Sequence, residues 1–198
     1  MNAPLRLGAV VLAAGASTRM GSPKQLIVHE GEPLVRRAAL NAADADADPV
    51  VVVLGANASL IAPSLFGLTP PITTVANPNW ETGLASSLVT GLRVLEDSTQ
   101  YDAVLVTLAD MPLVDIAALK RLVAAFDDQH RIVASAYNGV IGVPAVFARE
   151  YVAELMQLEG DSGAGQWLRQ RQSEVTSIPL DAGAVDIDTP EDKTRFLS

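Results

Sequence analysis

The residues best suited to chemistry lie in one stretch near the start of the chain, residues 10–25. An apolar run that begins at Leu7 stops at four small residues, 13–16, and Arg19 and Lys24 follow shortly after them. Small side chains let a ligand approach the backbone closely, and successive N–H groups in a tight loop form a concavity for phosphate oxygens. Two cations add positive charge, so this stretch is predicted to bind phosphate groups.

The stretch matches neither of the common glycine-rich phosphate-binding motifs. A P-loop places Lys directly after its second Gly, whereas Gly21 is followed by Ser22. A dinucleotide-binding loop has the pattern GxGxxG, whereas Gly15 is followed by Ala16 and Ser17. An ordinary strand-to-helix turn is the structural alternative, and the two cations in a chain otherwise short of them argue against it.

Three aspartates far along the chain are candidate cation ligands. Asp110 follows an apolar segment, residues 101–108, and the C-terminal end of a buried strand is where ligands of open α/β sheets bind. A helix cap is the alternative role, although Asp115 is better placed for it. Asp186 and Asp188 are two residues apart, so in an extended segment both project to one face. Such a pair destabilises a fold unless a positive group lies beside it.

Hydroxyl groups mark the start of a helix expected after the loop at residues 77–83. Ser86, Ser87 and Thr90 are poor choices for a helix that only packs, because their hydroxyls compete for backbone hydrogen bonds. They are better explained if the helix start faces a ligand. The alternative is that Ser86 or Ser87 merely caps the helix.

The order of apolar segments predicts the scaffold that positions these groups. Strand, helix and strand in succession imply a right-handed parallel crossover, so the fold class is α/β with a mostly parallel sheet. Strands are expected from Leu7 and at residues 50–54, 72–75, 101–108, 131–136 and 175–179, with an irregular hairpin or edge strand at 140–147. Helices are expected at residues 32–43, 58–66 and 113–126, after the loops at 77–83 and 160–165, and after Thr189, which can cap the last one.

Composition limits the class of protein. The 198 residues suffice for one domain, and 49% hydrophobic but only 5% aromatic residues are typical of a parallel sheet flanked by helices. The absence of cysteine excludes disulfides and thiolate sites. A net charge of -9 argues against nucleic-acid binding, and no segment is apolar enough to span a membrane, so a cytoplasmic protein is expected. An acidic protein that binds polyphosphate needs concentrated cations and a divalent metal.

Six motifs carry a resemblance to a known family. They are LAAGxSxRMGxxK at 12–24, NxxWxxGxxxS at 77–87, ADMP at 109–112, GxP at 142–144, GDxGA at 160–164 and DIDTPED at 186–192. In this order and spacing the chain resembles the MobA-like nucleotidyltransferases, and especially the molybdenum cofactor cytidylyltransferases. The resemblance covers nearly the whole chain.

The resemblance implies a Rossmann-like, three-layer fold of the nucleotide-diphospho-sugar transferase type. It implies an enzyme that moves a nucleoside monophosphate from an NTP to a phosphate acceptor and releases pyrophosphate. The implied roles are triphosphate binding by Gly15, Arg19 and Lys24, base contacts from the backbone of Leu12, Ala13 and Ala14, base and ribose contacts at Gly83 and Ser87, and Mg²⁺ binding by Asp110 with Asp188 or Asp186. Arg19, Lys24 and Asp110 are the implied catalytic residues.

The implied substrates are CTP and a molybdopterin-type acceptor. Ala14 stands before Gly15, where guanylyl-transferring relatives tend to have Gly, and this favours the cytidylyl branch. The N-terminal part of the single domain, residues 1–198, is expected to bind the nucleotide, and residues 139–147 and 160–164 the acceptor. The protein partner that the resemblance implies is a molybdoenzyme or its chaperone.

Other functions remain open at this stage. Within the same class they are guanylyl transfer and sugar-phosphate nucleotidylyl transfer. From other classes they are a non-catalytic module that loads cofactor onto an apo-enzyme, and nicotinamide-dependent oxidoreduction, which the missing GxGxxG disfavours. His29 and His130, the two histidines, are expected at the surface.

Overall fold

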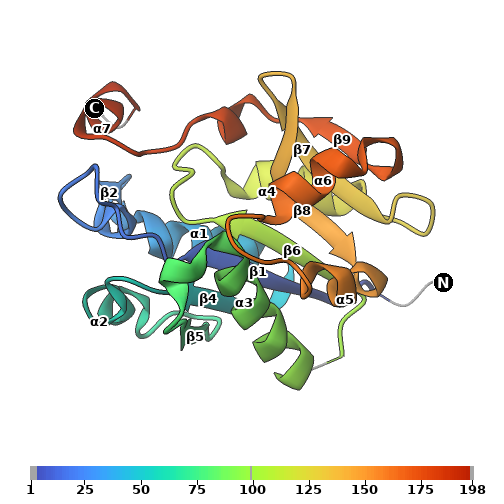
Figure 1. Ribbon diagram of the computed structural model, residues 1–198, viewed down its shortest axis with the longest axis horizontal. Coiled ribbons are helices and arrows are strands. Elements are labelled where there is room, and N and C mark those ends of the chain that lie inside the picture. The colour runs from blue at the N-terminus through green and yellow to red at the C-terminus, as the bar shows by residue number, and fades with distance from the viewer. Residues whose placement is uncertain (1–3, 99, 197–198) are drawn as a thin grey trace.

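A seven-stranded sheet in the order β5-β4-β1-β6-β8-β7-β9 forms the centre of the computed structural model, which describes residues 4–98 and 100–196 (Figure 1). Strands β5, β4, β1 and β6 are mutually parallel, β8 is antiparallel to its neighbours β6 and β7, and β9 is parallel to β7. The predicted α/β class with a mostly parallel sheet is confirmed. The strands are β1 (Leu7–Ala13), β4 (Ala47–Leu54), β5 (Thr73–Ala76), β6 (Ala103–Leu108), β7 (Ile132–Tyr137), β8 (Val140–Ala148) and β9 (Thr176–Pro179), and a separate ribbon pairs β2 (Val28–His29) with β3 (Glu32–Pro33).

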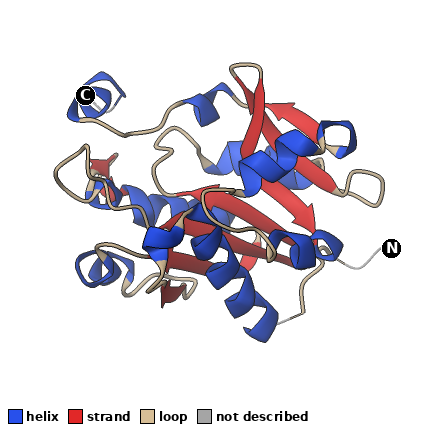
Figure 2. Ribbon diagram, in the orientation of Figure 1, coloured by secondary structure: helices blue, strands red, loops and turns tan. Residues whose placement is uncertain are grey.

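Helices cover both faces of the sheet and give the three-layer arrangement (Figure 2). The helices α1 (Leu34–Asp44) and α4 (Ile116–Ala124) pack on one face, and α3 (Leu84–Ser98) and α6 (Ala164–Gln170) pack on the other. Short helices are α2 (Ala58–Ile61), α5 (Val152–Leu155) and α7 (Pro190–Phe196), with 3₁₀ turns at Lys24–Leu26, Ala62–Leu65, Trp80–Thr82, Arg149–Tyr151, Gln172–Glu174 and Asp181–Ala184. Within the described ranges, no helix combines the length and apolarity needed to cross a bilayer.

Strand β1, the third strand of the sheet, leads into the loop of small residues. All seven of its residues are buried, as expected for a strand covered by helices on both faces. It lies between β4 and β6, in register with both through Leu12, which pairs with Val53 on one side and Leu108 on the other. The carboxyl ends of these three parallel strands therefore meet at one edge of the sheet.

Of the two alternatives predicted for residues 140–147, an irregular hairpin or an edge strand, the structure confirms the irregular hairpin. The hairpin forms, but β8 lies inside the sheet between β6 and β7. The register of β7 and β8 shifts between Ala134 and Ser135, and the Ser135 hydroxyl donates to the carbonyl of Pro144 at 2.7 Å. This irregularity accommodates Gly142 and Pro144 without ending the strand.

Several predicted helices begin later or are less regular. The helix expected from residue 32 begins at Leu34 after the β3 pairing, and that expected from residue 113 begins at Ile116, where Asp115 accepts from the Ala118 N–H as its cap. The segment 58–66 is one α-turn followed by a 3₁₀ turn that contains Pro63, because proline cannot donate within a helix.

The C-terminal segment crosses back to the N-terminal part of the molecule. Ile187 is buried in a small apolar cluster with Ile27 and Leu34, against which Met20 and Phe196 pack. Thr189 caps α7 as predicted, since its hydroxyl accepts from the Asp192 N–H at 3.2 Å and the Asp192 carboxylate accepts from the Thr189 N–H at 2.8 Å. These contacts hold residues 186–188 beside the N-terminal loop.

Candidate active site

Strand pairing brings Asp110 to the glycine-containing loop. The Ala109 N–H, just beyond β6, donates to the Leu12 carbonyl at 3.0 Å, so the segments that leave β1 and β6 start side by side. The backbone carbonyl of Asp110 in turn accepts from the Ile187 N–H at 3.2 Å, which places Asp188 at the same edge. Residues from the beginning, the middle and the last part of the chain thus meet where ligands of such sheets bind.

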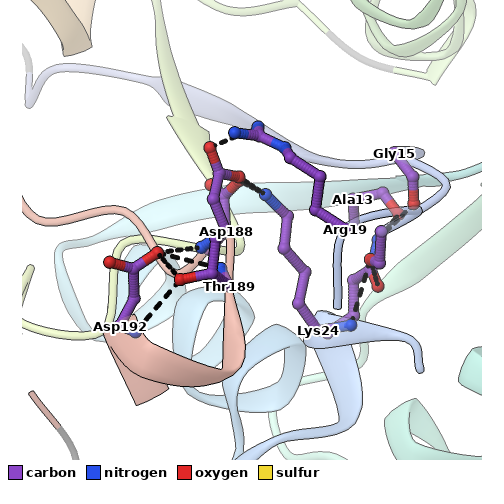
Figure 3. Close-up of polar contacts among 10 residues, drawn as sticks. Ala13, Gly15, Arg19, Lys24, Asp188, Thr189 and Asp192 are labelled. Atoms are coloured by element: carbon purple, nitrogen blue, oxygen red, sulfur yellow. Dashed lines mark hydrogen bonds and ion pairs between the residues drawn. The ribbon is translucent and has the colours of Figure 1, made fainter. Parts of the chain in front are cut away.

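Lys24 lies between the two carboxylates. Its Nζ is 2.5 Å from Asp110 Oδ2 and 2.8 Å from Asp188 Oδ1. Arg19 Nη2 lies 2.6 Å from Asp188 Oδ2, and Figure 3 shows both cations directed at this carboxylate. The side chain of Lys24 is 13% exposed and that of Arg19 is 68% exposed, so Lys24 is held inside the site while Arg19 reaches it from solvent.

The charges of the site change the pKa values of its members. Burial opposes the charge on Lys24, but Asp110 and Asp188 raise its pKa above the ordinary value. The hydrogen bond from Lys24 lowers the pKa of Asp188. Burial, and then the charge of Asp110, raises the pKa of Asp186 to about 6. Asp186 therefore lies close enough to Asp110 for that charge to raise its pKa, whereas Asp188 forms the ion pairs with Lys24 and Arg19.

A cavity of about 440 Å³ opens beside this group. It contacts the loop at Leu12, Ala13, Ala14, Gly15 and Ala16, the side chains of Lys24, Gln25 and Asp110, and the segment that leads into α3, including Gly83 and Ser87. Arg19, Asp186 and Asp188 are outside its lining; Asp188 contacts the lining residue Lys24, and Arg19 contacts Asp188. The structure thus brings together most of the residues singled out from the sequence.

The start of α3 combines a structural and a lining role. The buried Asn77 donates from Nδ2 to the hydroxyls of Ser86, at 2.8 Å, and Ser87, at 3.0 Å. Ser86 donates in turn to the Gly83 carbonyl at 2.8 Å, a bond from within the helix to a preceding carbonyl and not a cap, while Ser87 lines the cavity. Gly83 has a φ of 114°, and a Cβ there would lie 2.2 Å from the Gly160 carbonyl oxygen, so only glycine allows the loop at 160–161 to approach.

Other lining residues were not predicted from the sequence. They are Gln25, Trp80, Glu81, Leu84, Leu108 and Ala109, whereas Asp161 lies in the segment 160–164 that is expected from the sequence to bind the acceptor. Trp80 and Asp161 belong to motifs noted in the sequence, NxxWxxGxxxS and GDxGA, which is the signal that identifies them as candidates. Gln25 carries no signal of its own, because nothing in its neighbours shows that it is buried.

The carboxylates fit a cation site made by two protein ligands. Asp110 Oδ1 is buried and accepts no hydrogen bond within the described residues, and its other oxygen already contacts the Lys24 ammonium. Hard divalent cations prefer carboxylate oxygens and often take remaining ligands from substrate phosphates. No group of three or more His, Asp or Glu side chains in the part of the chain that the structure describes is arranged to hold a metal. Asp110 and Asp188 thus fit a two-ligand cation site and do not form a complete cage.

A second cavity, of about 200 Å³, adjoins the first. The two share Leu12, Leu84, Leu108 and Asp161 in their linings. The second is otherwise formed by Tyr137, Gly142 and Val143 of the β7–β8 hairpin and by residues 163–166 and Arg169. The segments expected from the sequence to bind an acceptor, 139–147 and 160–164, therefore both contribute to it.

Two curated proteins illustrate what the chain is similar to. It is 31% identical to "Nicotine blue oxidoreductase" of Paenarthrobacter nicotinovorans, with 95% of each chain covered. It is 28% identical to "Molybdenum cofactor guanylyltransferase" of Shewanella frigidimarina, with 98% of this chain and 96% of the relative covered.

Solved structures share the fold over nearly the full length. Rv0371c of Mycobacterium tuberculosis superposes with a TM-score of 0.80 at 26% identity, covering 99% of both chains. Its complex with manganese gives a TM-score of 0.76 at 25% identity, covering 97% of this chain and 98% of that one. A nucleotidyl transferase of Methanothermobacter has a TM-score of 0.82 at 22% identity, covering 97% and 96%, and shows the same fold.

The family model gives the assignment. Residues 9–175 match the model of the MobA-like NTP transferase domain. The match begins inside β1 and includes the loop, Asp110 and the residues of both cavities. With this match and its mostly parallel α/β sheet, the chain belongs to the MobA-like NTP transferase family of nucleotidyltransferases.

Proposed function

We propose that the protein transfers CMP from CTP to the phosphate of a molybdopterin-type acceptor, with release of pyrophosphate. The observation that carries the proposal is the contact of Lys24 with Asp110 and Asp188 at the edge of a cavity lined by the loop 12–16. A cluster of this kind supplies both signs of charge that a metal-bound triphosphate needs.

The reaction is an in-line substitution at the α-phosphorus. An acceptor phosphate oxygen forms the new bond to the α-phosphorus, the bond from the α-phosphorus to the bridging oxygen breaks, and pyrophosphate leaves with that electron pair. Both reactants are anions, so catalysis consists mainly of positioning and charge neutralisation. In this proposal Lys24 and Arg19 stabilise the charge that develops on pyrophosphate.

Asp110 and Asp188 are the residues that would hold a divalent cation such as Mg²⁺, which supplies positive charge to the phosphate oxygens. The related Rv0371c structure is described as a complex with manganese, which supports divalent metal use in this fold. Asp186, whose pKa is raised, is assigned a smaller contribution to binding the divalent cation.

The choice of CTP rests on Ala14. A methyl group stands there where guanylyl-transferring relatives tend to have Gly, and Ala14 lines the cavity. Guanylyl transfer is the main rival, because one relative is named a guanylyltransferase. In our assignment Gly83 and Ser87 contact the base and ribose, and the second cavity takes the acceptor.

The decisive experiment is a nucleotide-consumption assay. Purified protein would be given each of the four NTPs with Mg²⁺ or Mn²⁺, with and without molybdopterin, and pyrophosphate release would be measured. We expect release that requires CTP, metal and acceptor together. Release with GTP instead would change the nucleotide but keep the reaction. Binding of nucleotide and acceptor without release would favour the non-catalytic loading module.

An oxidoreductase control belongs in the same experiment. A relative at 31% identity is named an oxidoreductase, so oxidation of NADH and NADPH would be followed in the presence of a reducible dye. We expect no protein-dependent oxidation. Rapid dye reduction, together with no pyrophosphate from any NTP, would overturn the proposed function.

A further inference from the structure

Gln25 is an uncharged side chain buried between the loop and the body of the domain. It is 2% exposed and lies in the 3₁₀ turn Lys24–Leu26. Its Nε2 donates to the carbonyl oxygen of Ala13 at 3.0 Å and to that of Gly15 at 2.8 Å. An amide nitrogen has two hydrogens, so this group is fully used by two carbonyls of the loop.

The other end of the amide joins a second part of the loop. The Ser17 hydroxyl donates to Gln25 Oε1 at 3.3 Å and accepts from the Lys24 N–H at 3.0 Å. Ser17 has a φ of 56°, a conformation that non-glycine residues seldom adopt without a local cause. The network therefore connects the end of β1, the left-handed residue and the backbone of Lys24.

The Gln25 contacts fix the directions of two alternate peptide groups, and a contact with Ala56 fixes the one between them. In a trans peptide the N–H points opposite to the C=O, so holding the carbonyls of Ala13 and Gly15 on Gln25 turns the next N–H groups away from it. The carbonyl between them, of Ala14, is held by the Ala56 N–H at 3.2 Å on a different segment. The N–H groups of Ala14, Gly15 and Ala16 are thus all set in direction before a ligand arrives.

The same three residues line the cavity of about 440 Å³. Donors that are already oriented bind an anion without the cost of ordering a loop, so their arrangement affects affinity directly. A residue that only stabilised the fold would not need to engage two alternate carbonyls of a ligand-facing loop.

We propose that Gln25 is a positioning residue that presets the N–H groups of Ala14 and Ala16 for the nucleotide, beside the Gly15 N–H that the Ala56 contact orients, an inference that rests on the proposed nucleotidyl transfer. It acts through the loop backbone and, through Ser17, on the placement of Lys24. Its removal should therefore weaken nucleotide binding more than it weakens the fold.

The test uses two variants of Gln25 and one matched control. Gln25→Met removes all its hydrogen bonds, and Gln25→Glu keeps the shape but places carboxylate oxygens opposite the two carbonyls. Asn41→Leu is the control, because Asn41 Nδ2 also makes an amide-to-carbonyl bond, at 3.0 Å to Val114, away from the cavity. Affinity for CTP with Mg²⁺, and for each other NTP, is measured by calorimetry without acceptor, so no turnover occurs.

We expect both Gln25 variants to bind the preferred nucleotide about tenfold or more weakly. Hydrogen exchange at residues 14–16 should be faster in both variants without ligand. In turnover, KM for the nucleotide should rise while KM for the acceptor is unchanged. Asn41→Leu should lose thermal stability but keep the wild-type dissociation constant. Wild-type affinity and exchange in the Gln25 variants would overturn the inference while leaving the proposed function intact.

Two other results are informative: failure of the Gln25 variants to fold, and failure of the wild-type protein to bind any NTP. If the Gln25 variants do not fold, Ser17→Ala interrupts the same network from a partly exposed position, and we expect a smaller, roughly threefold loss of nucleotide affinity with faster exchange. An unchanged affinity and exchange in this variant would count against the inference. If the wild-type protein binds none of the four NTPs, the proposed function itself fails and this inference fails with it.

Discussion

Lys24 and Asp188 are separated by 164 positions in the sequence, yet the ammonium of one lies 2.8 Å from a carboxylate oxygen of the other. The same ammonium contacts Asp110, which belongs to a third region of the chain. The Lys24 ammonium therefore lies between the two carboxylates that we assign to metal binding. The first three predictions follow from this arrangement.

Asp110→Asn should lower the rate of pyrophosphate release about 100-fold or more while the fold survives, because the variant loses a charged ligand for the cation. Steady-state kinetics with CTP and acceptor measure the rate. Asp115→Asn is the matched control, since Asp115 caps α4 away from the cavity and Asn also caps helices well. Near-normal turnover in Asp110→Asn would show that the metal assignment is wrong.

Lys24→Met should bind Mn²⁺ about tenfold more tightly in the absence of nucleotide, since an ammonium that competes for the two carboxylates is removed. The same variant should have a raised KM for the nucleotide because a triphosphate contact is lost. Electron paramagnetic resonance of free Mn²⁺ gives the metal affinity. Weaker Mn²⁺ binding would mean that Lys24 does not occupy the cation position.

Asp188→Asn should reduce Mn²⁺ affinity and turnover at least about tenfold, whereas Asp186→Asn should have a smaller effect. Asp188 contacts both cations of the loop, while burial raises the pKa of Asp186 to about 6, so part of its population is neutral near pH 6. Calorimetric Mn²⁺ titrations of the two variants provide the comparison. A larger loss in Asp186→Asn would reverse the assignment.

Gly83→Ala should destabilise the fold by about 2–4 kcal/mol, through a positive φ and a Cβ only 2.2 Å from the Gly160 carbonyl oxygen. Gly139→Ala is the control, because it also has a positive φ but nothing within 4 Å of its Cβ, and should cost about 1–2 kcal/mol. Urea denaturation measures both. Equal losses would show that the contact with Gly160 is not tight.

The pair of Arg6 and Asp102 should make stability depend on acid pH. Hydrogen bonds from the Arg6 side chain and backbone lower the pKa of Asp102 to about 2, so the folded state binds its proton less readily than the unfolded state. The stabilisation is then present above about pH 4 and is lost as the pH falls to about 2.

The Asp102→Asn variant tests whether this stabilisation is lost as the pH falls. The wild type should exceed the variant in unfolding free energy at pH 7, and the difference should shrink between pH 4 and pH 2.5, as measured by urea denaturation. A difference that stays constant over that range would show that Arg6 does not hold the Asp102 carboxylate in solution.

Local sequence determined some features well. The limits of β1 follow from an uninterrupted apolar run that ends at small residues, and Asp110 could be placed at the end of β6 because a polar residue follows a buried strand. The cap at Thr189 also follows from neighbouring residues alone.

Features that depend on distant contacts could not be read in this way. The position of β8 inside the sheet depends on a register shift opposite Ser135, which the local sequence does not reveal. Gly142 and Pro144 are also typical of an edge strand, so the sequence left that alternative open. The burial of Gln25 depends on two carbonyls that turn toward it. The difference between Asp186 and Asp188 depends on how the tail crosses Lys24, which alternation along an extended segment does not reveal.

The late position of Asp188 has a consequence during synthesis. Strands β1 to β9 leave the ribosome before residue 187, so a nascent chain can build its sheet while Arg19 lacks the Asp188 carboxylate and Lys24 has only Asp110 of its two carboxylate partners. Until Ile187 packs with Ile27 and Leu34, the second carboxylate of the candidate site is missing, so the site is completed only when the last part of the chain has been made.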